Sequence, residues 1–143
     1  MGTRALYGYK RNGEQKISYC HCDGYPSGLG VTMLDFCRNS DLGEMNSLFD
    51  RIELVEEMES VKGKKLLDLP WSYLTPNSDH SEEWYMYDMA DFTDYQYKYI
   101  INLDTDCLER WDSKDFGSTC SLVSEVNLRD LAEIDKAITK WDS

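Results

Sequence analysis

The sequence lacks the features with which proteins cross or enter membranes. None of its apolar runs approaches the roughly 18 residues that a membrane-spanning helix needs. Residues 1–13, MGTRALYGYKRNG, contain no signal-peptide core. Leu6 stands where an N-myristoylation motif requires serine or threonine. We therefore expect a cytoplasmic, intracellular protein that does not bind membranes.

Basic residues are scarce as well. Lysine and arginine number 15 against 27 aspartates and glutamates, which leaves a formal net charge of −12. Proteins bind nucleic acids largely by neutralising phosphates with lysine and arginine, so direct nucleic-acid binding is not expected. An acidic surface suits solubility, and it also suits a protein that is steered onto a basic partner surface.

The cysteines and histidines are too few and too irregularly spaced to predict a set of disulfides or a zinc site. The five cysteines are predicted to be reduced thiols rather than disulfides. Cys20, His21 and Cys22 suggest zinc at first, but strand alternation sends His21 to the opposite face from the two thiols. His21 then also points away from the thiols it would need to activate as nucleophiles. The sequence thus predicts neither a metal nor another cofactor, and no catalytic residue of this kind.

The first hairpin can be predicted with its register. Tyrosine-rich runs flank Asn12-Gly13, a dipeptide typical of type I′ two-residue turns. That turn makes the indices of paired residues sum to 25. The expected pairs are Leu6 with Tyr19, Gly8 with Ile17, and Arg4 with His21.

The rest of the chain alternates between helical and strand-like patterns. We expect helices at 31–39 and 44–60, then a strand within 83–92, for which a helix is the alternative. A second hairpin is expected at 95–113 with its turn at 104–106, and a last helix from about Asn127 with Asp130 in its cap. The order ββααβββα predicts an α+β fold, an antiparallel sheet of about five strands packed with about three helices. We expect residues 1–143 to form a single globular domain. The oligomeric state is open, and a homo-oligomer is compatible with the sequence.

The best candidate site lies where the first hairpin leads into a helix. Alternation places Arg4, His21 and Asp23 on one face, and a Gly-rich turn follows. Such residues suit a small polar or anionic ligand at a helix N-terminus, with arginine as a fixed cation and tyrosine as an aromatic face. The alternative is a structural brace, with Arg4 paired to Asp23 and the glycines permitting a tight turn. The candidate ligand-binding residues are Arg4, His21, Asp23, Tyr25, Gly28 and Gly30.

The same residues carry a resemblance. The opening MGTR…NG…DGYPSGLG resembles a family of small, largely uncharacterised proteins found often in phages and prophages. Members begin Gly-Thr-Arg, continue through an Asn/Asp-Gly hairpin and reach a WDGYPxGxG signature before a helix. Cys22 departs from that pattern, since it stands where the family usually has tryptophan. The resemblance covers about the first third of the chain.

The resemblance implies a context rather than an activity: a phage accessory protein acting in the host-cell cytoplasm against host machinery or host defence. Two versions of such a binding protein follow. One contacts a host protein through an acidic, tyrosine-rich surface, and the other captures a nucleotide-like ligand in the Gly-rich turn. The alternative is a small hydrolase or transferase acting on that ligand through His21 and Asp23.

Overall fold

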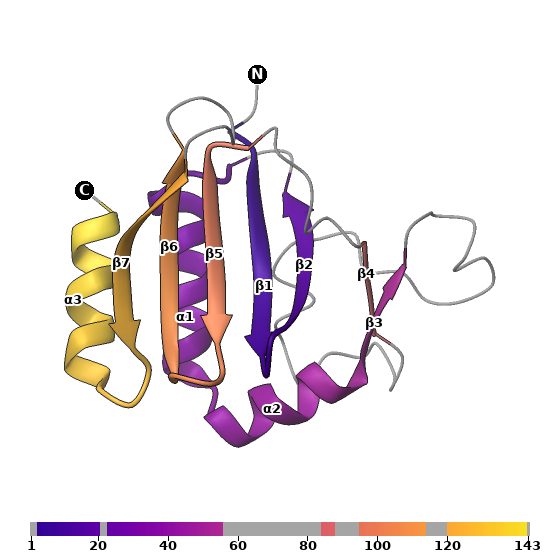
Figure 1. The fold of residues 1–143 in the computed structure, drawn as a ribbon. Helices are drawn as coiled ribbons and strands as arrows, with labels where there is room; N and C mark the ends of the chain where they lie inside the picture. Colours follow the sequence, from indigo (N-terminus) through magenta and orange to yellow (C-terminus); the bar gives the residue numbers. More distant parts are fainter. Residues whose placement is uncertain (1–2, 21–22, 56–83, 88–94, 114–119, 143) are drawn as a thin grey trace.

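The computed structural model describes residues 3–20, 23–55, 84–87, 95–113 and 120–142. They form a five-stranded sheet with helices on one face, and a separate two-stranded sheet (Figure 1). The strands are β1 (Ala5–Arg11), β2 (Glu14–Cys20), β3 (Ile52–Val55), β4 (Trp84–Tyr87), β5 (Tyr97–Asn102), β6 (Cys107–Ser113) and β7 (Cys120–Asn127). The helices are a π-helical turn, η1 (Pro26–Gly30), followed by α1 (Val31–Asn39), α2 (Leu42–Arg51) and α3 (Leu131–Trp141).

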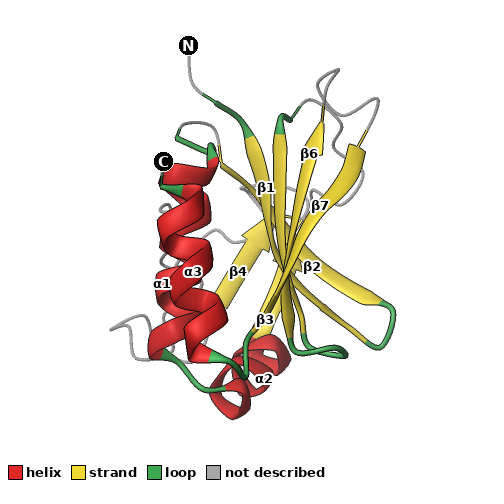
Figure 2. Cartoon of the chain, turned by 90° about the vertical axis from the view of Figure 1, so that its left-hand side faces the viewer, coloured by secondary structure: helices red, strands yellow, loops and turns green. Residues whose placement is uncertain are grey.

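The predicted α+β class is confirmed, and the main sheet is mostly antiparallel. Its order is β2-β1-β5-β6-β7. Pairing is antiparallel within the two hairpins β1–β2 and β5–β6 and between β6 and β7, whereas β1 and β5 are parallel. The sheet is therefore mixed rather than wholly antiparallel, because the two hairpins join through strands that run in the same direction. Helices α1 and α3 lie side by side on one face, and α2 lies across one end (Figure 2).

The register of the first hairpin is confirmed. Leu6 pairs with Tyr19 and Gly8 with Ile17, as the two-residue turn requires. Asn12 and Gly13 have φ angles of 52° and 80°, the left-handed values that a type I′ turn needs. The expected partner of Arg4, His21, lies outside the described residues.

The main core lies between the sheet and the helices. Alternate strand residues face α1, α2 and α3, and large tyrosines dominate the sheet side because their rings span the gap to the helices. A smaller cluster covers the other face. The main core includes Tyr7, Tyr9, Met33, Leu34, Leu48, Phe49, Tyr99, Leu108 and Ile134, and the smaller one Leu6, Ile17, Tyr95 and Ile100.

Two predicted boundaries and the assignment of one strand to the main sheet were wrong. The helix expected over 44–60 ends at Arg51, and β3 follows directly, paired in parallel with β4. Ile-Glu-Leu-Val is a short, mostly apolar run with two β-branched residues, so it fits a strand as well as a helical stripe. The strand predicted within 83–92 is present as β4, but β7 supplies the fifth strand of the main sheet. Finally, β7 continues to Asn127, and α3 begins only at Leu131.

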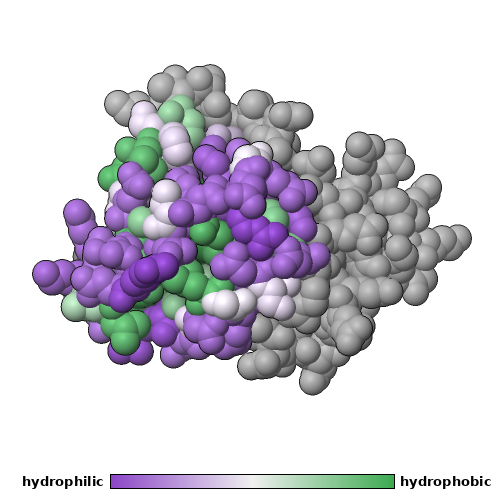
Figure 3. Space-filling model, turned by 60° about the horizontal axis from the view of Figure 1, so that its bottom comes forward, coloured by the Kyte–Doolittle hydropathy of each residue, from purple (hydrophilic) through white to green (hydrophobic). Residues whose placement is uncertain are grey.

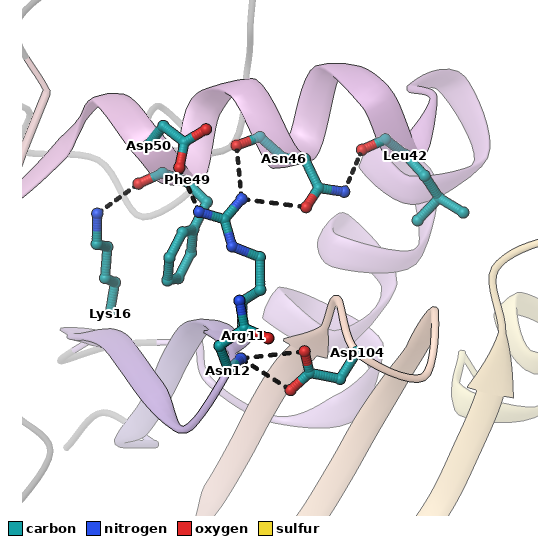
Figure 4. A network of polar contacts seen from close by, with 8 residues as sticks. All are labelled: Arg11, Asn12, Lys16, Leu42, Asn46, Phe49, Asp50 and Asp104. Atoms are coloured by element: carbon teal, nitrogen blue, oxygen red, sulfur yellow. Dashed lines mark hydrogen bonds and ion pairs between the residues drawn. The ribbon is translucent and has the colours of Figure 1, made fainter.

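A polar network fastens α2 to the first hairpin (Figure 4). The Arg11 guanidinium donates to the backbone oxygen and to Oδ1 of Asn46, at 3.3 and 3.2 Å, and pairs with Asp50. The Phe49 ring lies 4.4 Å from the Arg11 guanidinium and 4.3 Å from Lys16 Nζ, which donates to the Phe49 carbonyl. Both cations are thus used to hold the last turn of α2, where a helix dipole favours positive charge.

Candidate functional site

The loop between β2 and α1 is closed by its own backbone. Asp23 has a φ of 59°, and its carbonyl accepts a hydrogen bond from Leu29 N at 2.9 Å. Gly28 N and Gly30 N both donate to the Tyr25 carbonyl, at 2.9 and 3.5 Å. Gly24 N donates to the Thr3 carbonyl at 2.9 Å, which ties the loop to the start of β1. The N–H groups that a phosphate would use at a Gly-rich turn are therefore engaged within the loop.

The glycines of this loop are needed for close packing. A Cβ on Gly28 would lie 2.5 Å from the Asp23 carbonyl oxygen, closer than side chains tolerate. A Cβ on Gly30 would lie 3.1 Å from both the Trp141 and the Tyr99 rings. The space that glycine leaves free is thus occupied by the chain itself, which is the brace interpretation of the Gly-x-Gly motif.

Asp23 and Tyr25 form a pair on the surface of the loop. Tyr25 keeps 39% of its surface exposed, and its hydroxyl donates to Asp23 Oδ1 at 3.3 Å. The Asp23 carboxylate raises the pKa of the Tyr25 hydroxyl, so the hydroxyl stays protonated at neutral pH. The pair presents an aromatic face and a carboxylate to solvent, and tyrosine is enriched at protein contacts because it joins an apolar ring to a polar hydroxyl.

The other predicted site residues have mixed outcomes. Arg4 lies immediately before β1, next to the loop through the Thr3–Gly24 contact, and its carbonyl accepts from Gln96 N at 2.9 Å. His21 lies outside the described residues, so its place beside Arg4 stays a prediction. The structure therefore brings four of the six residues, Asp23, Tyr25, Gly28 and Gly30, into one turn.

An aromatic cluster beneath the loop was missed by the sequence analysis. The Tyr99 hydroxyl donates to the Gly24 carbonyl at 2.7 Å, and its ring lies 6.1 Å from that of Trp141. Tyr97 stacks on Tyr99 with a ring separation of 6.3 Å. Strand alternation and helical spacing say only which residues of one element share a face. Neither pattern says that β5 and the end of α3 meet at Gly30.

Arg110 completes this cluster. It binds the Asp112 carboxylate through two hydrogen bonds of 2.9 Å, and its guanidinium lies 5.9 Å from the Tyr97 ring and 5.4 Å from the Trp141 ring. The positive charge of Arg110 is thus paired with Asp112, and its planar guanidinium lies against aromatic rings of the same chain. The cluster supports the loop from below rather than offering a free cation to a ligand.

The described cysteines do not form a reactive or metal-binding centre. Cys20, Cys37, Cys107 and Cys120 are not joined in disulfides, and Cys20 faces the main core. Burial raises the pKa of Cys37 far above its ordinary value of 9.0, so it is not a thiolate. Within the described ranges no three histidine, cysteine or acidic side chains gather as a metal site would require. Cys22 and His21 lie outside those ranges.

Comparisons with protein-family models, curated proteins and solved structures found no match. Function therefore has to be argued from the geometry of this chain. Among the described helices, none is long and apolar enough to cross a membrane.

Proposed function

We propose that this chain is a non-enzymatic, phage-type accessory protein that binds a host protein and inhibits or sequesters it. The contact is made by the internally hydrogen-bonded loop at 23–30, with Tyr25 and Asp23 at its surface. Arg4 and His21 remain predicted neighbours of that contact. The observation that carries the proposal is that the loop uses its own donors internally and presents an aromatic ring and a carboxylate outward.

Protein contact fits this loop better than capture of a nucleotide-like ligand. Three consecutive N–H groups, those of Gly28, Leu29 and Gly30, already donate to backbone carbonyls. A phosphate would have to break these bonds, and each lost bond costs about 0.5–1.5 kcal/mol. A partner protein, in contrast, can cover Tyr25 without changing the loop. Pre-organised surfaces of this kind lose little conformational entropy on binding.

The charge of the chain indicates the kind of partner. A net charge of −12 favours a basic surface on the target and accelerates encounter at low ionic strength. Asp23 lies within the proposed contact, so it can meet a lysine or arginine of the target directly. Binding should therefore weaken as salt is raised.

Site-specific photo-crosslinking in bacterial cells tests the proposal. A photoreactive phenylalanine analogue replaces Tyr25 in one variant and Glu14 in the other. Glu14 is equally on the surface but lies at the opposite end of the β1–β2 hairpin. We expect a discrete crosslinked protein from position 25 that is not obtained from position 14. Equal crosslinking from both positions, or none from position 25, would contradict the proposal.

A further inference from the structure

Two of the large exposed apolar side chains of the described surface are neighbours on β7. Leu122 is 41% exposed and Val123 is 53% exposed, whereas the other two exposed large hydrophobic residues, Tyr25 on the loop and Leu131 at the start of α3, belong to other elements. Seen from the lower end, hydrophilic residues dominate, with separate hydrophobic patches between them (Figure 3). Adjacent exposed apolar residues on a sheet edge suit a contact better than solvent.

β7 is an edge strand that offers its backbone to a partner. It pairs with β6 on one side, and no described strand pairs with it on the other. The opposite edge of the sheet differs, because β2 packs beside β4. Along this eight-residue strand, the side turned away from β6 presents a row of N–H and C=O groups that no other described strand binds. Extended segments bind such edges by adding a strand.

Acidic groups lie next to the apolar pair. Glu125 is exposed, and in the part of the chain that the structure describes it has no ion-pair partner. Burial raises the pKa of Cys107, and the nearby carboxylates of Glu125, Glu133 and Asp106 raise it further. The lower half of β7 is thus a region of negative potential. Arg129 offsets part of it by pairing with Asp106 at 2.6 Å.

The first half of β7 contains the apolar pair, and the side chain beside Leu122 is held by several contacts. Leu122 lies opposite Trp111 on β6. The Trp111 indole donates to Glu109 Oε1 at 3.0 Å, and Asn102 donates to Glu109 Oε2 at 2.9 Å. Lys98 Nζ lies 4.8 Å from the Trp111 ring. The ring beside Leu122 is therefore fixed, as residues at the centre of a contact usually are.

We propose that the β7 edge, Leu122–Asn127, docks an extended, basic segment of another protein by strand addition. Apolar side chains of that segment cover Leu122 and Val123, and a lysine or arginine meets Glu125.

A second copy of this chain fits the edge poorly. Two copies would bring two strongly acidic surfaces together, since each carries a net charge of −12. The register shift between β6 and β7 at Arg110/Trp111 leaves Val123 as an extra residue, a bulge. A bulge interrupts the regular hydrogen-bonding pattern of an edge strand, so it disfavours pairing with a second copy along the whole strand. A shorter regular stretch remains for a partner segment.

Peptide binding to the full chain tests the proposal. The probe is a fluorescein-labelled peptide of four Val-Lys repeats, and the measurement is fluorescence anisotropy. We expect Leu122→Ser and Glu125→Lys each to weaken binding about tenfold, which corresponds to about 1.4 kcal/mol. Leu131→Ser and Glu14→Lys are matched controls that remove an exposed leucine or reverse an exposed charge elsewhere. They should change binding less than twofold.

Other peptides and a sedimentation measurement distinguish a basic extended segment from other partners at the β7 edge. A peptide of Val-Glu repeats should not bind, and neither should a Val-Lys peptide whose two central valines are proline, because proline cannot donate to a strand. Equal binding by either peptide, or equal weakening in Glu14→Lys and Glu125→Lys, would overturn the proposal. So would dimerisation in sedimentation that Leu122→Ser abolishes. Tyr25→Ala should bind the peptide normally, so this test and the loop test fail separately.

Discussion

At the scale of single residues, two buried tyrosines provide a matched contrast. Tyr9 is fully buried, with its ring edge-on to Phe49 at 6.4 Å, and among the described atoms its hydroxyl has no hydrogen-bond partner. Tyr99 is equally buried, but its hydroxyl donates to the Gly24 carbonyl. Burial raises the pKa of both hydroxyls. The two side chains therefore have the same shape and burial, and they differ in whether the hydroxyl makes a hydrogen bond among the described atoms.

Replacing each by phenylalanine should change stability in opposite directions. Tyr9→Phe removes an unsatisfied buried hydroxyl and should raise the free energy of unfolding by about 1 kcal/mol. Tyr99→Phe leaves the Gly24 carbonyl without its donor and should lower it by about 1–2 kcal/mol. Urea denaturation of both variants measures this. Destabilisation by both substitutions to the same extent would show that Tyr9 has a partner.

At the scale of elements, the start of α3 depends on one carboxylate. Asp130 has extended backbone angles and accepts from Ala132 N at 3.0 Å and from Glu133 N at 3.3 Å. These are donors that a helix N-terminus otherwise leaves unpaired. The helix also carries Trp141, which packs against Tyr99 beneath the loop. The cap therefore supports the element that supports the candidate site.

Removing this cap should cost a measurable part of the stability. Asp130→Ala should lower the free energy of unfolding by about 1 kcal/mol, because Ala132 N loses its side-chain acceptor and Glu133 N keeps only the Asp130 carbonyl. Asp130→Asn keeps an acceptor in place and should cost less. Chemical denaturation compares the two. Equal losses would mean that the charge of Asp130, rather than its hydrogen bonds, stabilises α3.

Elements whose signals are local were predictable from the sequence. Asn12-Gly13 determined both a turn and the register of its hairpin, and the helical spacing of 31–39 identified α1. What could not be predicted depends on distant partners. Ile52–Val55 forms a strand because Trp84–Tyr87 pairs with it, and the parallel contact of β1 with β5 has no local signature.

The candidate site divides in the same way. Asp23, Tyr25, Gly28 and Gly30 meet because they are close in sequence. Tyr99, Trp141 and Arg110 arrive from β5, α3 and β6, and only the assembled sheet shows that they lie under Gly24 and Gly30.

At the scale of the whole molecule, a buried cysteine thiol and a buried tyrosine hydroxyl make the free energy of unfolding fall at alkaline pH. The pKa of the Cys37 thiol is raised above its ordinary value of 9.0, and that of the Tyr99 hydroxyl above 10.0, in both cases chiefly by burial. An unfolded chain releases these protons at the ordinary values, whereas the folded chain keeps them. Their contribution is fully present below pH 9.0 and is lost as pH rises above it. Lys16 acts oppositely, since burial lowers its pKa from 10.5.

Stability should therefore fall between pH 9 and pH 10, where cysteine titrates before tyrosine in the unfolded chain. Cys37→Ala should flatten this decline, because one proton fewer is released on unfolding. The measurement is the free energy of unfolding in urea at several pH values. An unchanged slope in Cys37→Ala would show that the Cys37 thiol does not contribute to the decline.

The central claim is that the loop at 23–30 is a contact surface for a protein rather than a pocket for a ligand. A native mass spectrum of the protein purified from bacterial cells tests it most directly. The account predicts a complex with a second protein that is lost in Tyr25→Ala and kept in Glu14→Ala. A bound small molecule of nucleotide mass, released intact on heating, would contradict it.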